Sequence, residues 1–404
     1  MNKIEEMIKE LCPNGVEWKK LGDVCTFQNG FAFKSQFFKE NGNAIIRITN
    51  INKNTIDLND VVFFDKSDYR ENLSIYEIHN GDILVAMSGA TTGKIGVYKG
   101  LDTCYLNQRV GTFRPFCDIL SNQYLYHFLT TKVNDMYLLA GGGAQPNLSS
   151  IKLMSSLQIP LPPLPIQTEI VRILDKFVEQ QEQIERLIEL RKKQYEYYRE
   201  EMLKPKEGEV WETKTIGELL EFKNGLNASK DQFGHGNPIV NYVNVYKKRS
   251  IYKQDLTGLV ELDINTRKRY DVKKGDVFFT RTSETLEEIG YASVLLEDVE
   301  NGVFSGFVLR GRPVNNMLYP EYCKYCFSTK NIRMQIQALS TMTTRALTNG
   351  KSLSKVKICL PYYDKQKEIA DALDSFETSI TALTSALEAS KKRYEYYRDE
   401  MMRF

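Results

Sequence analysis

The sequence predicts an α+β fold in which two related α/β domains are separated by two long, antiparallel, coiled-coil-like helices in a circular, pseudo-two-fold arrangement. The first reason is an internal repeat: KKQYEYYREEML (192–203) and KKRYEYYRDEMM (391–402) agree at nine of twelve positions, with a constant offset of 199. The second is that each copy ends a stretch of 37 residues without Pro or Gly, 167–203 and 366–402. The third is that short β-branched and aromatic runs, broken by Asn and Gly, precede each stretch, as in small mixed domains. We therefore expect domains at 1–165 and 206–364, and helices at 166–205 and 365–404.

The first domain is predicted from strand-like runs such as AIIRITNI (44–51) and DVVFFD (60–65), which Asn and Gly turns separate. The segment IPLPPLP (159–165) follows and contains four prolines in seven residues. Proline inside a helix removes a backbone donor and clashes with the preceding turn, so this segment predicts an extended stop before the first long helix.

Both predicted helices carry apolar residues at alternating steps of three and four, the pattern of a coiled-coil seam. The seams contain Ile170, Leu174, Phe177, Ile184, Ile188, Tyr195 and Tyr198 in the first helix, and Ile369, Leu373, Phe376, Ile380, Leu383, Leu387, Tyr394 and Tyr397 in the second. Each helix would span about 55 Å at 1.5 Å per residue. If the seams pack together, the helices run antiparallel. Because CPNGVEW (12–18) resembles KPKEGEVW (204–211), the repeat then continues from the end of the chain to its start.

The two mixed domains are also related to each other, though more weakly. Gly22, Phe27, Asn29 and Gly30 match Gly217, Phe222, Asn224 and Gly225 at an offset of 195. At an offset of 194, NGDIL (80–84) matches KGDVF (274–278), and Gly96 matches Gly290. The segments between these positions diverge, as in a shared scaffold that carries different loops. Two related binders of different targets would have this pattern.

The composition is that of an ordinary globular chain. It has 404 residues, 42% of them hydrophobic, and a formal net charge of only +2, so that any surface for nucleic acid must be locally basic. No apolar run approaches the ~18 residues of a membrane span, and the opening MNKIEEMIKEL does not read as a signal peptide. The seven cysteines, an odd and scattered number, predict reduced thiols and a cytoplasmic location.

Two motifs are similar to a nucleotide-binding loop and to a metal-binding pair, but each departs from the full pattern. The loop SGATTGKIG (88–96) departs from the phosphate-loop pattern at Ser88 and Ile95, which argues against nucleotide hydrolysis. It could still present Lys94 and backbone amides to DNA, or it could be an ordinary hairpin. Cys323 and Cys326 form a CxxC pair, but no second pair has zinc spacing and the three histidines are dispersed. In the predicted helix YPEYCKYCFSTKNIRMQI this spacing favours packing.

Clusters of basic and amide side chains are the candidates for DNA contact, because Arg, Lys, Asn and Gln pair with base edges and phosphates. For any single cluster, a solvated surface is the alternative interpretation. The candidates are Arg47, Arg70, Thr91, Thr92, Lys94, Gln108, Arg109, Gln145 and Asn147 in the first domain, and Tyr242, Asn244, Lys247, Lys248, Arg249, Arg267, Arg269, Arg281, Thr282, Arg345 and Lys351 in the second.

The YEYYRxEM stripe that ends both helices is the candidate for partner binding. Three tyrosines so close together cannot all face one neighbouring helix, so part of this surface is expected to meet another chain. Packing within the chain is the alternative. The candidate residues are Tyr195, Tyr198, Arg199, Tyr394, Tyr397 and Arg398.

Over nearly its whole length the chain resembles the specificity subunits of type I restriction–modification systems. The resemblance rests on LCPNGVEWKKLGDVCTFQNG (11–30), on IPLPPLPIQTEIVRILDKF (159–177) with its degenerate copy CLPYYDKQKEIADALDSF (359–376), and on the two YEYYRxEM helix ends. At Tyr362 and Tyr363 the second junction departs from the Pro-Leu pattern of the first.

The resemblance implies two target-recognition domains, each reading one half of a split, asymmetric double-stranded DNA site. It implies helices that set the spacing and dock two methyltransferase subunits, which restriction and translocase subunits then join. It also implies a chain that is not itself an enzyme and has no cofactor of its own, because S-adenosylmethionine is bound by the methyltransferase partner. The competing hypotheses are a stand-alone DNA-binding adaptor or regulator, and an enzyme whose catalytic site has no familiar motif.

Overall fold

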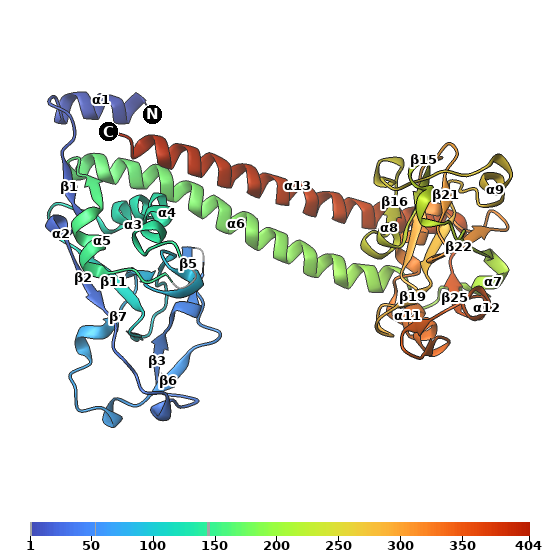
Figure 1. The fold of residues 1–404 in the computed structure, drawn as a ribbon, viewed down its shortest axis with the longest axis horizontal. Coiled ribbons are helices and arrows are strands. Elements are labelled where there is room, and N and C mark those ends of the chain that lie inside the picture. Colours follow the sequence, from blue (N-terminus) through green and yellow to red (C-terminus); the bar gives the residue numbers. More distant parts are fainter. Residues whose placement is uncertain (1, 53, 144–145) are drawn as a thin grey trace. The chain divides into compact units, whose positions relative to one another are not determined.

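The computed structural model describes residues 2–52, 54–143 and 146–404, and it divides into two compact units. Unit 1 contains Met1–Glu185 with Ser385–Phe404, and unit 2 contains Arg186–Thr384. Each unit combines β-sheets, short helices and parts of the two long helices α6 (Leu164–Met202) and α13 (Tyr363–Met401) (Figure 1). The predicted α+β class, with two related domains and long helices, is confirmed.

Both long helices have 39 residues and begin two residues earlier than predicted, at Leu164 and Tyr363 rather than at 166 and 365. Pro165 therefore lies in the first turn of α6 instead of in the extended stop. The first turn tolerates proline because its amide groups have no acceptor within the helix. Both helices also end before the predicted limits of 205 and 404, at Met202 and Met401.

Unit 1 is built on two mixed sheets. The larger has the strand order β2-β11-β8-β9-β5-β4 and the smaller has the order β6-β3-β10-β7. The larger sheet consists of β2 (Cys25–Asn29), β11 (Val110–Pro115), β8 (Ile83–Ala86), β9 (Ile95–Val97), β5 (Asn54–Ile56) and β4 (Ile51–Asn52). The smaller consists of β6 (Val62–Phe64), β3 (Asn43–Ile46), β10 (Cys104–Leu106) and β7 (Glu77–Ile78). The helices of unit 1 besides the long pair are α1 (Asn2–Leu11), α2 (Leu21–Val24), α3 (Asn122–Thr131), α4 (Val133–Leu139) and α5 (Ser150–Ser156). β1 (Trp18–Lys20) pairs with β12 (Gln158–Pro160) just before α6.

Unit 2 repeats this plan of a main sheet with smaller sheets beside it. Its main sheet, in the order β14-β22-β18-β20-β16, consists of β14 (Leu220–Asn224), β22 (Val308–Pro313), β18 (Val277–Thr280), β20 (Ala292–Leu295) and β16 (Ser250–Ile251). The smaller sheets are β17 (Leu259–Val260), β15 (Phe233–Val240) and β21 (Val303–Phe304); β19 (Thr282–Ser283), β24 (Ala346–Leu347) and β23 (Thr341–Met342); and β13 (Glu212–Thr215) with β25 (Lys357–Leu360). The short helices are α7 (Ile216–Leu219), α8 (Tyr242–Lys247), α9 (Ile264–Arg269), α10 (Pro320–Cys326), α11 (Lys330–Ala338) and α12 (Gly350–Leu353). The helix predicted around the CxxC pair is therefore two helices, α10 and α11.

The strand registers of the main sheets show which residues of the two domains are equivalent. Asn29 lies opposite Gly111, and Asn224 lies opposite Leu309 at the same place in unit 2. The predicted match of Gly96 with Gly290 is wrong. The Gly93 amide donates to the Ala86 carbonyl, as the Gly290 amide donates to the Thr280 carbonyl, and both glycines have positive φ. The loop before Gly290 is three residues longer, because 280 to 290 is ten positions and 86 to 93 is seven. That insertion shifted the sequence match.

The two long helices run antiparallel within each unit. In unit 1 the Phe177 ring stacks on Tyr397 with centroids 5.6 Å apart, and the Lys391 ammonium lies 2.9 Å from the Glu185 carboxylate. In unit 2 the Tyr198 ring stacks on Phe376, also at 5.6 Å. The predicted seam is therefore formed, and its ends are built into the domain cores.

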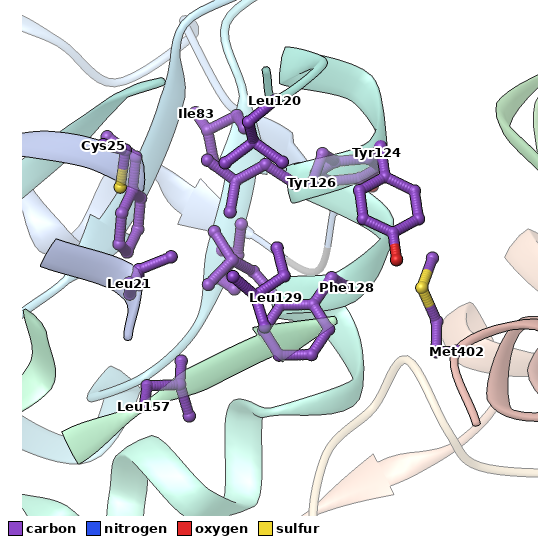
Figure 2. Close-up of a cluster of buried hydrophobic side chains, with 14 of the residues drawn as sticks. Leu21, Cys25, Ile83, Leu120, Tyr124, Tyr126, Phe128, Leu129, Leu157 and Met402 are labelled. Carbon is purple, nitrogen blue, oxygen red and sulfur yellow. The ribbon is translucent and has the colours of Figure 1, made fainter. Parts of the chain in front are cut away.

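The core of unit 1 joins the long helices to the domain. It combines side chains of α3 and of the main sheet with Ile170 and Leu174 of α6 and with Met402, just after α13. Figure 2 shows Met402 near the hydroxyl end of Tyr124 from α3. In unit 2, Ile369 and Leu373 of α13 occupy the corresponding core. Burial of this apolar area fixes the ends of the helices to their domains.

Hydrogen bonds of one buried histidine also join the domain to the long helices. The imidazole of His127 on α3 is fully buried, and its Nε2 lies 2.8 Å from Asp175 Oδ1 on α6. Its Nδ1 lies 2.9 Å from the hydroxyl of Tyr394 on α13. Since the carboxylate can only accept, Nε2 carries a proton and donates to Asp175, and Nδ1 forms the second hydrogen bond with the tyrosine hydroxyl. One side chain of the domain thus holds both long helices.

Candidate nucleic-acid interface

In unit 1, several predicted DNA contacts lie on three adjoining loops. The Met87 amide donates to the Arg109 carbonyl at 2.8 Å, and the Leu148 amide donates to the Met87 carbonyl at 2.7 Å. These bonds hold the loop after β8, the turn before β11 and the segment before α5 together. Lys94, Gln108, Arg109 and Asn147 are exposed on these loops.

The remaining predicted residues of unit 1 differ in their surroundings. Thr91 is half-buried, and Thr92 is buried with its hydroxyl donating to the Gly89 carbonyl at 2.7 Å, so that Thr92 shapes the loop. The Arg47 guanidinium donates to the Asp60 carbonyl, and Arg70 is exposed. Gln145 lies outside the described residues.

In unit 2, part of the predicted set is engaged within the protein. The Asn244 amide caps α8: it accepts from the Asn241 backbone and donates to the Asp255 carbonyl. Lys248 pairs with the Asp255 carboxylate. The Arg249 guanidinium donates to the Tyr195 hydroxyl and lies 3.3 Å from the Glu377 carboxylate. These contacts give Asn244, Lys248 and Arg249 structural roles.

Other predicted residues of α8 and α9 face outward in part. Tyr242 is half-buried and stacks on Tyr246 with ring centroids 5.5 Å apart, while Lys247 is exposed. At the end of α9, Arg267 is half-buried and Arg269 is exposed.

Two of the remaining predicted residues of unit 2, Arg281 and Lys351, line a groove. Its volume is about 540 Å³, and Lys223, Asn224 and Asn349 also line it. Thr282 lies on β19 and Arg345 on the turn between β23 and β24; β24 pairs with both of these strands. Lys223, Asn224 and Asn349 were not among the predicted residues. The repeat held a signal for Lys223, because it stands in the shared Phe-x-Asn-Gly segment where the first domain has Gln28.

The aromatic stripe divides into packed and exposed residues. Tyr195 and Tyr394 are buried, and Tyr198 and Tyr397 stack on the opposite helix. The Arg199 and Arg398 guanidinium groups lie over the rings of Tyr195 and Tyr394, at 5.9 and 5.5 Å from the centroids. Tyr198 still exposes 43% of its surface, and Tyr197 and Tyr396, which the predicted set did not include, are exposed at 63% and 60%. Partner binding by the stripe stays a prediction.

Other chemistry is not assembled in the described part of the chain. Cys323 and Cys326 are buried in the core of unit 2, so they pack within the protein as their spacing predicted. Burial also raises the pKa of the Cys326 thiol. Over residues 2–52, 54–143 and 146–404, no group of three His, Cys, Asp or Glu side chains is placed to hold a metal ion. None of the helices described is long and apolar enough to cross a membrane.

The comparison with protein families matches both halves of the chain. Residues 13–192 and 208–390 each match the type I restriction modification DNA specificity domain. The chain belongs to this family. A Haemophilus influenzae protein whose name includes "type I restriction enzyme specificity subunit" is 31% identical over 300 residues, covering 70% of this chain and 73% of that protein. The EcoKI specificity subunit of Escherichia coli K12 is 25% identical over 385 residues, covering 88% of this chain and 81% of that one.

Solved structures show the same fold. The specificity subunit from M. genitalium superposes with a TM-score of 0.56 at 16% identity, over 97% of both chains. A chain from a study of the assembly of the type I restriction–modification system superposes with a TM-score of 0.58 at 18% identity, over 97% of this chain and 98% of that one. The predicted family is confirmed, and this specificity subunit is a DNA-recognition protein that works in a complex with other subunits.

Proposed function

We propose that the two domains of this specificity subunit each read one half of a bipartite, asymmetric DNA site. The observation that carries the proposal is the repeated main sheet: β2, β11 and β8 have the same pairing as β14, β22 and β18, while the loops around them carry different side chains. A common frame with different loops supports two binders of the same kind with different targets.

The long helices have two roles in this proposal. They separate the two half-sites, and they dock the methyltransferase subunits. Helices anchored in a domain core at each end resist bending and sliding, which supports their role as a spacer. The exposed rings of Tyr197 and Tyr396 support the docking role, because tyrosine is enriched at the centres of protein interfaces.

The chemistry belongs to the partners. The two methyltransferase subunits bind S-adenosylmethionine and take the target adenine out of the DNA stack, and restriction and translocase subunits complete the cleaving complex. The specificity subunit contributes recognition without catalysis, and it acts in the cytoplasm where the DNA is accessible.

A methylome tests this function. Genomic DNA is sequenced from the host and from a strain that lacks this gene, with the methyltransferase expressed in both. We expect the deletion to abolish adenine methylation at one split, asymmetric motif, and a plasmid copy of the gene to restore it. Unchanged methylation would reject the proposal. A stand-alone DNA-binding adaptor or regulator would then be the better hypothesis.

A further inference from the structure

The groove of unit 2 is a concave feature with a basic lining. It opens between β14, the segment that follows β18, and the start of α12. The residues that line it include Lys223, Arg281 and Lys351, two amides and Glu221. The side chains of Glu221 and Lys223 leave β14 on the face opposite to Asn224, because successive side chains of a strand alternate. A volume of about 540 Å³ is many times the ~30 Å³ that one water occupies, so the groove admits a solute larger than a few waters.

The positive charge of the groove is incompletely balanced. Among the described residues, neither Arg281 nor Lys351 forms an ion pair within 4.0 Å. The Lys223 ammonium donates to the Arg269 carbonyl and lies 5.6 Å from the centre of the Tyr270 ring. Burial lowers the pKa of Lys223, and the charges of Arg310 and Arg269 lower it further. A nearby anion would relieve this repulsion.

The first domain has neutral side chains at all three equivalent positions. The registers of β2 and β14 make Gln28 the counterpart of Lys223. Met87 is the counterpart of Arg281. The Leu148 amide donates to the Met87 carbonyl, as the Thr348 amide donates to the Arg281 carbonyl.

Ile151 is the counterpart of Lys351, because α5 and α12 have the same position beside a shared glycine. A Cβ added at Gly22 would lie 3.1 Å from the Met154 carbonyl oxygen, and a Cβ added at Gly217 would lie 3.0 Å from the Ser354 carbonyl oxygen. The offset of 200 between Met154 and Ser354 also relates 151 to 351. Charge at this groove therefore belongs to the second domain and not to the shared frame.

The edge of the groove differs as well. In the first domain the Asn29 amide donates to the Ser150 hydroxyl at 3.2 Å, which joins β2 to α5. The equivalent residues are Asn224 and Gly350, and glycine has no hydroxyl to accept such a bond. A Cβ at Gly350 would lie 2.7 Å from the Phe222 Cβ, so a side chain there is sterically disfavoured. The Asn224 amide is left facing the groove as a further polar group.

We propose that this groove binds a phosphate of the DNA backbone through Arg281 and Lys351, with Lys223 on the other face of β14 adding to the local positive charge, and so clamps the second domain onto its half-site. The proposal rests on the DNA-recognition function above. Guanidinium and ammonium groups form charge-assisted hydrogen bonds with phosphate oxygens, and amide donors such as Asn224 add to them. Such a contact fixes position and orientation without reading sequence.

DNA is favoured over an acidic surface of a partner subunit by the difference between the domains. Two copies of one methyltransferase that dock on two equivalent faces would need matching residues on both. The three cations have no charged counterparts in the first domain, whereas the two half-sites of an asymmetric site are free to be held differently.

The test transfers the first domain's residues into the groove. The full-length variant K223Q/R281M/K351I is compared with wild type for binding to a labelled duplex that carries the site found in the methylome, at several salt concentrations. We expect binding to weaken by about ten-fold, and the slope of log K against log salt to fall by about 1 to 2. The matched control K330Q/K357Q/K367Q removes three exposed cations of unit 2 outside the groove and should keep the wild-type slope.

Each result decides one question. Wild-type slope and affinity in a folded variant would overturn the phosphate clamp, even if inorganic phosphate stabilised the wild type alone. Normal DNA binding with lost capture of the methyltransferase would overturn it in favour of a protein-docking surface. If the triple variant fails to fold, the exposed K351E decides by the same measurement. Failure of the wild type to prefer any duplex would instead count against the proposed function.

Discussion

The buried imidazole of His127 is predicted to be a main anchor between the first domain and the two long helices. We expect H127L to destabilise unit 1 by about 2 to 3 kcal/mol. Two hydrogen bonds, to Asp175 and Tyr394, contribute about 0.5 to 1.5 kcal/mol each. The Tyr394 hydroxyl, in a residue that is 7% exposed, then loses this partner and adds part of a desolvation penalty. Asp175, with a side chain 44% exposed, can turn to water and adds little.

The two tryptophans allow the units to be followed separately. Trp18 belongs to unit 1 and Trp211 to unit 2, so W211F and W18F backgrounds give one reporter each. Urea unfolding followed by fluorescence should show the Trp18 transition of H127L at lower urea, with the Trp211 transition shifted less. H79L is the control, because the His79 side chain is 58% exposed, and it should change stability by less than about 0.5 kcal/mol.

A double-mutant cycle tests the contact itself. Y394F removes one hydrogen bond and should destabilise unit 1 by about 1 kcal/mol, and the two substitutions together should destabilise it by less than their sum. A Trp18 transition that H127L leaves within about 0.5 kcal/mol of wild type would refute the anchor. Full additivity in the cycle would show that His127 and Tyr394 act independently.

Three further predictions use other parts of the chain. The hydrogen bond from the Tyr105 hydroxyl, followed by the Lys66 contact, lowers the pKa of Glu77 below its ordinary 4.5. The ionised Glu77 carboxylate therefore stabilises unit 1 fully above pH 4.5, and this stabilisation is lost as the pH falls through the lowered pKa. E77Q should make the Trp18 unfolding transition less sensitive to acid. An unchanged acid sensitivity would contradict this prediction. Y197A/Y396A should weaken capture of the methyltransferase at least ten-fold while the urea transitions shift by less than about 0.5 kcal/mol; equal capture would remove the exposed rings from the interface. Deleting about four residues, one helical turn, from the middle of α6 should change the spacer length of the methylated motif, and an active variant with the original spacer would contradict the spacing role.

The sequence predicted the fold more completely than it predicted the residues of the candidate site. The repeat, the Pro-rich junction and the helical seam predicted both long helices to within a few residues, because each is a local or periodic signal. The match of Gly96 with Gly290 failed for a local reason as well: a loop insertion moved the equivalent turn, and only the strand register shows it.

The site needed contacts between distant segments. Lys223, Arg281 and Lys351 meet in one groove although 58 positions separate the first two and 70 the last two, and no pattern in the chain links them. Tyr195 was predicted both as a seam residue and as a candidate for partner binding. Its hydroxyl instead donates to Glu377 at 2.8 Å and accepts from Arg249, a contact that sequence spacing does not reveal.

The two units hold their helices with the same helix residues but different domain residues. Asp175 and Tyr394 in unit 1 correspond to Asp374 and Tyr195 in unit 2, each pair separated by the repeat offset of 199. His127 joins the first pair, whereas in unit 2 Tyr325 and Lys324 bind Asp374, and Arg249 binds Tyr195.

The helices therefore offer the same Asp and Tyr positions to both domains, and each domain binds them with different side chains. Such a division allows the recognition loops to differ between the domains while their attachment keeps the same form. It also predicts that a recognition domain transplanted onto the other end needs its own anchoring side chains, and that a graft of loops alone, which leaves those side chains in place, should fold without further change.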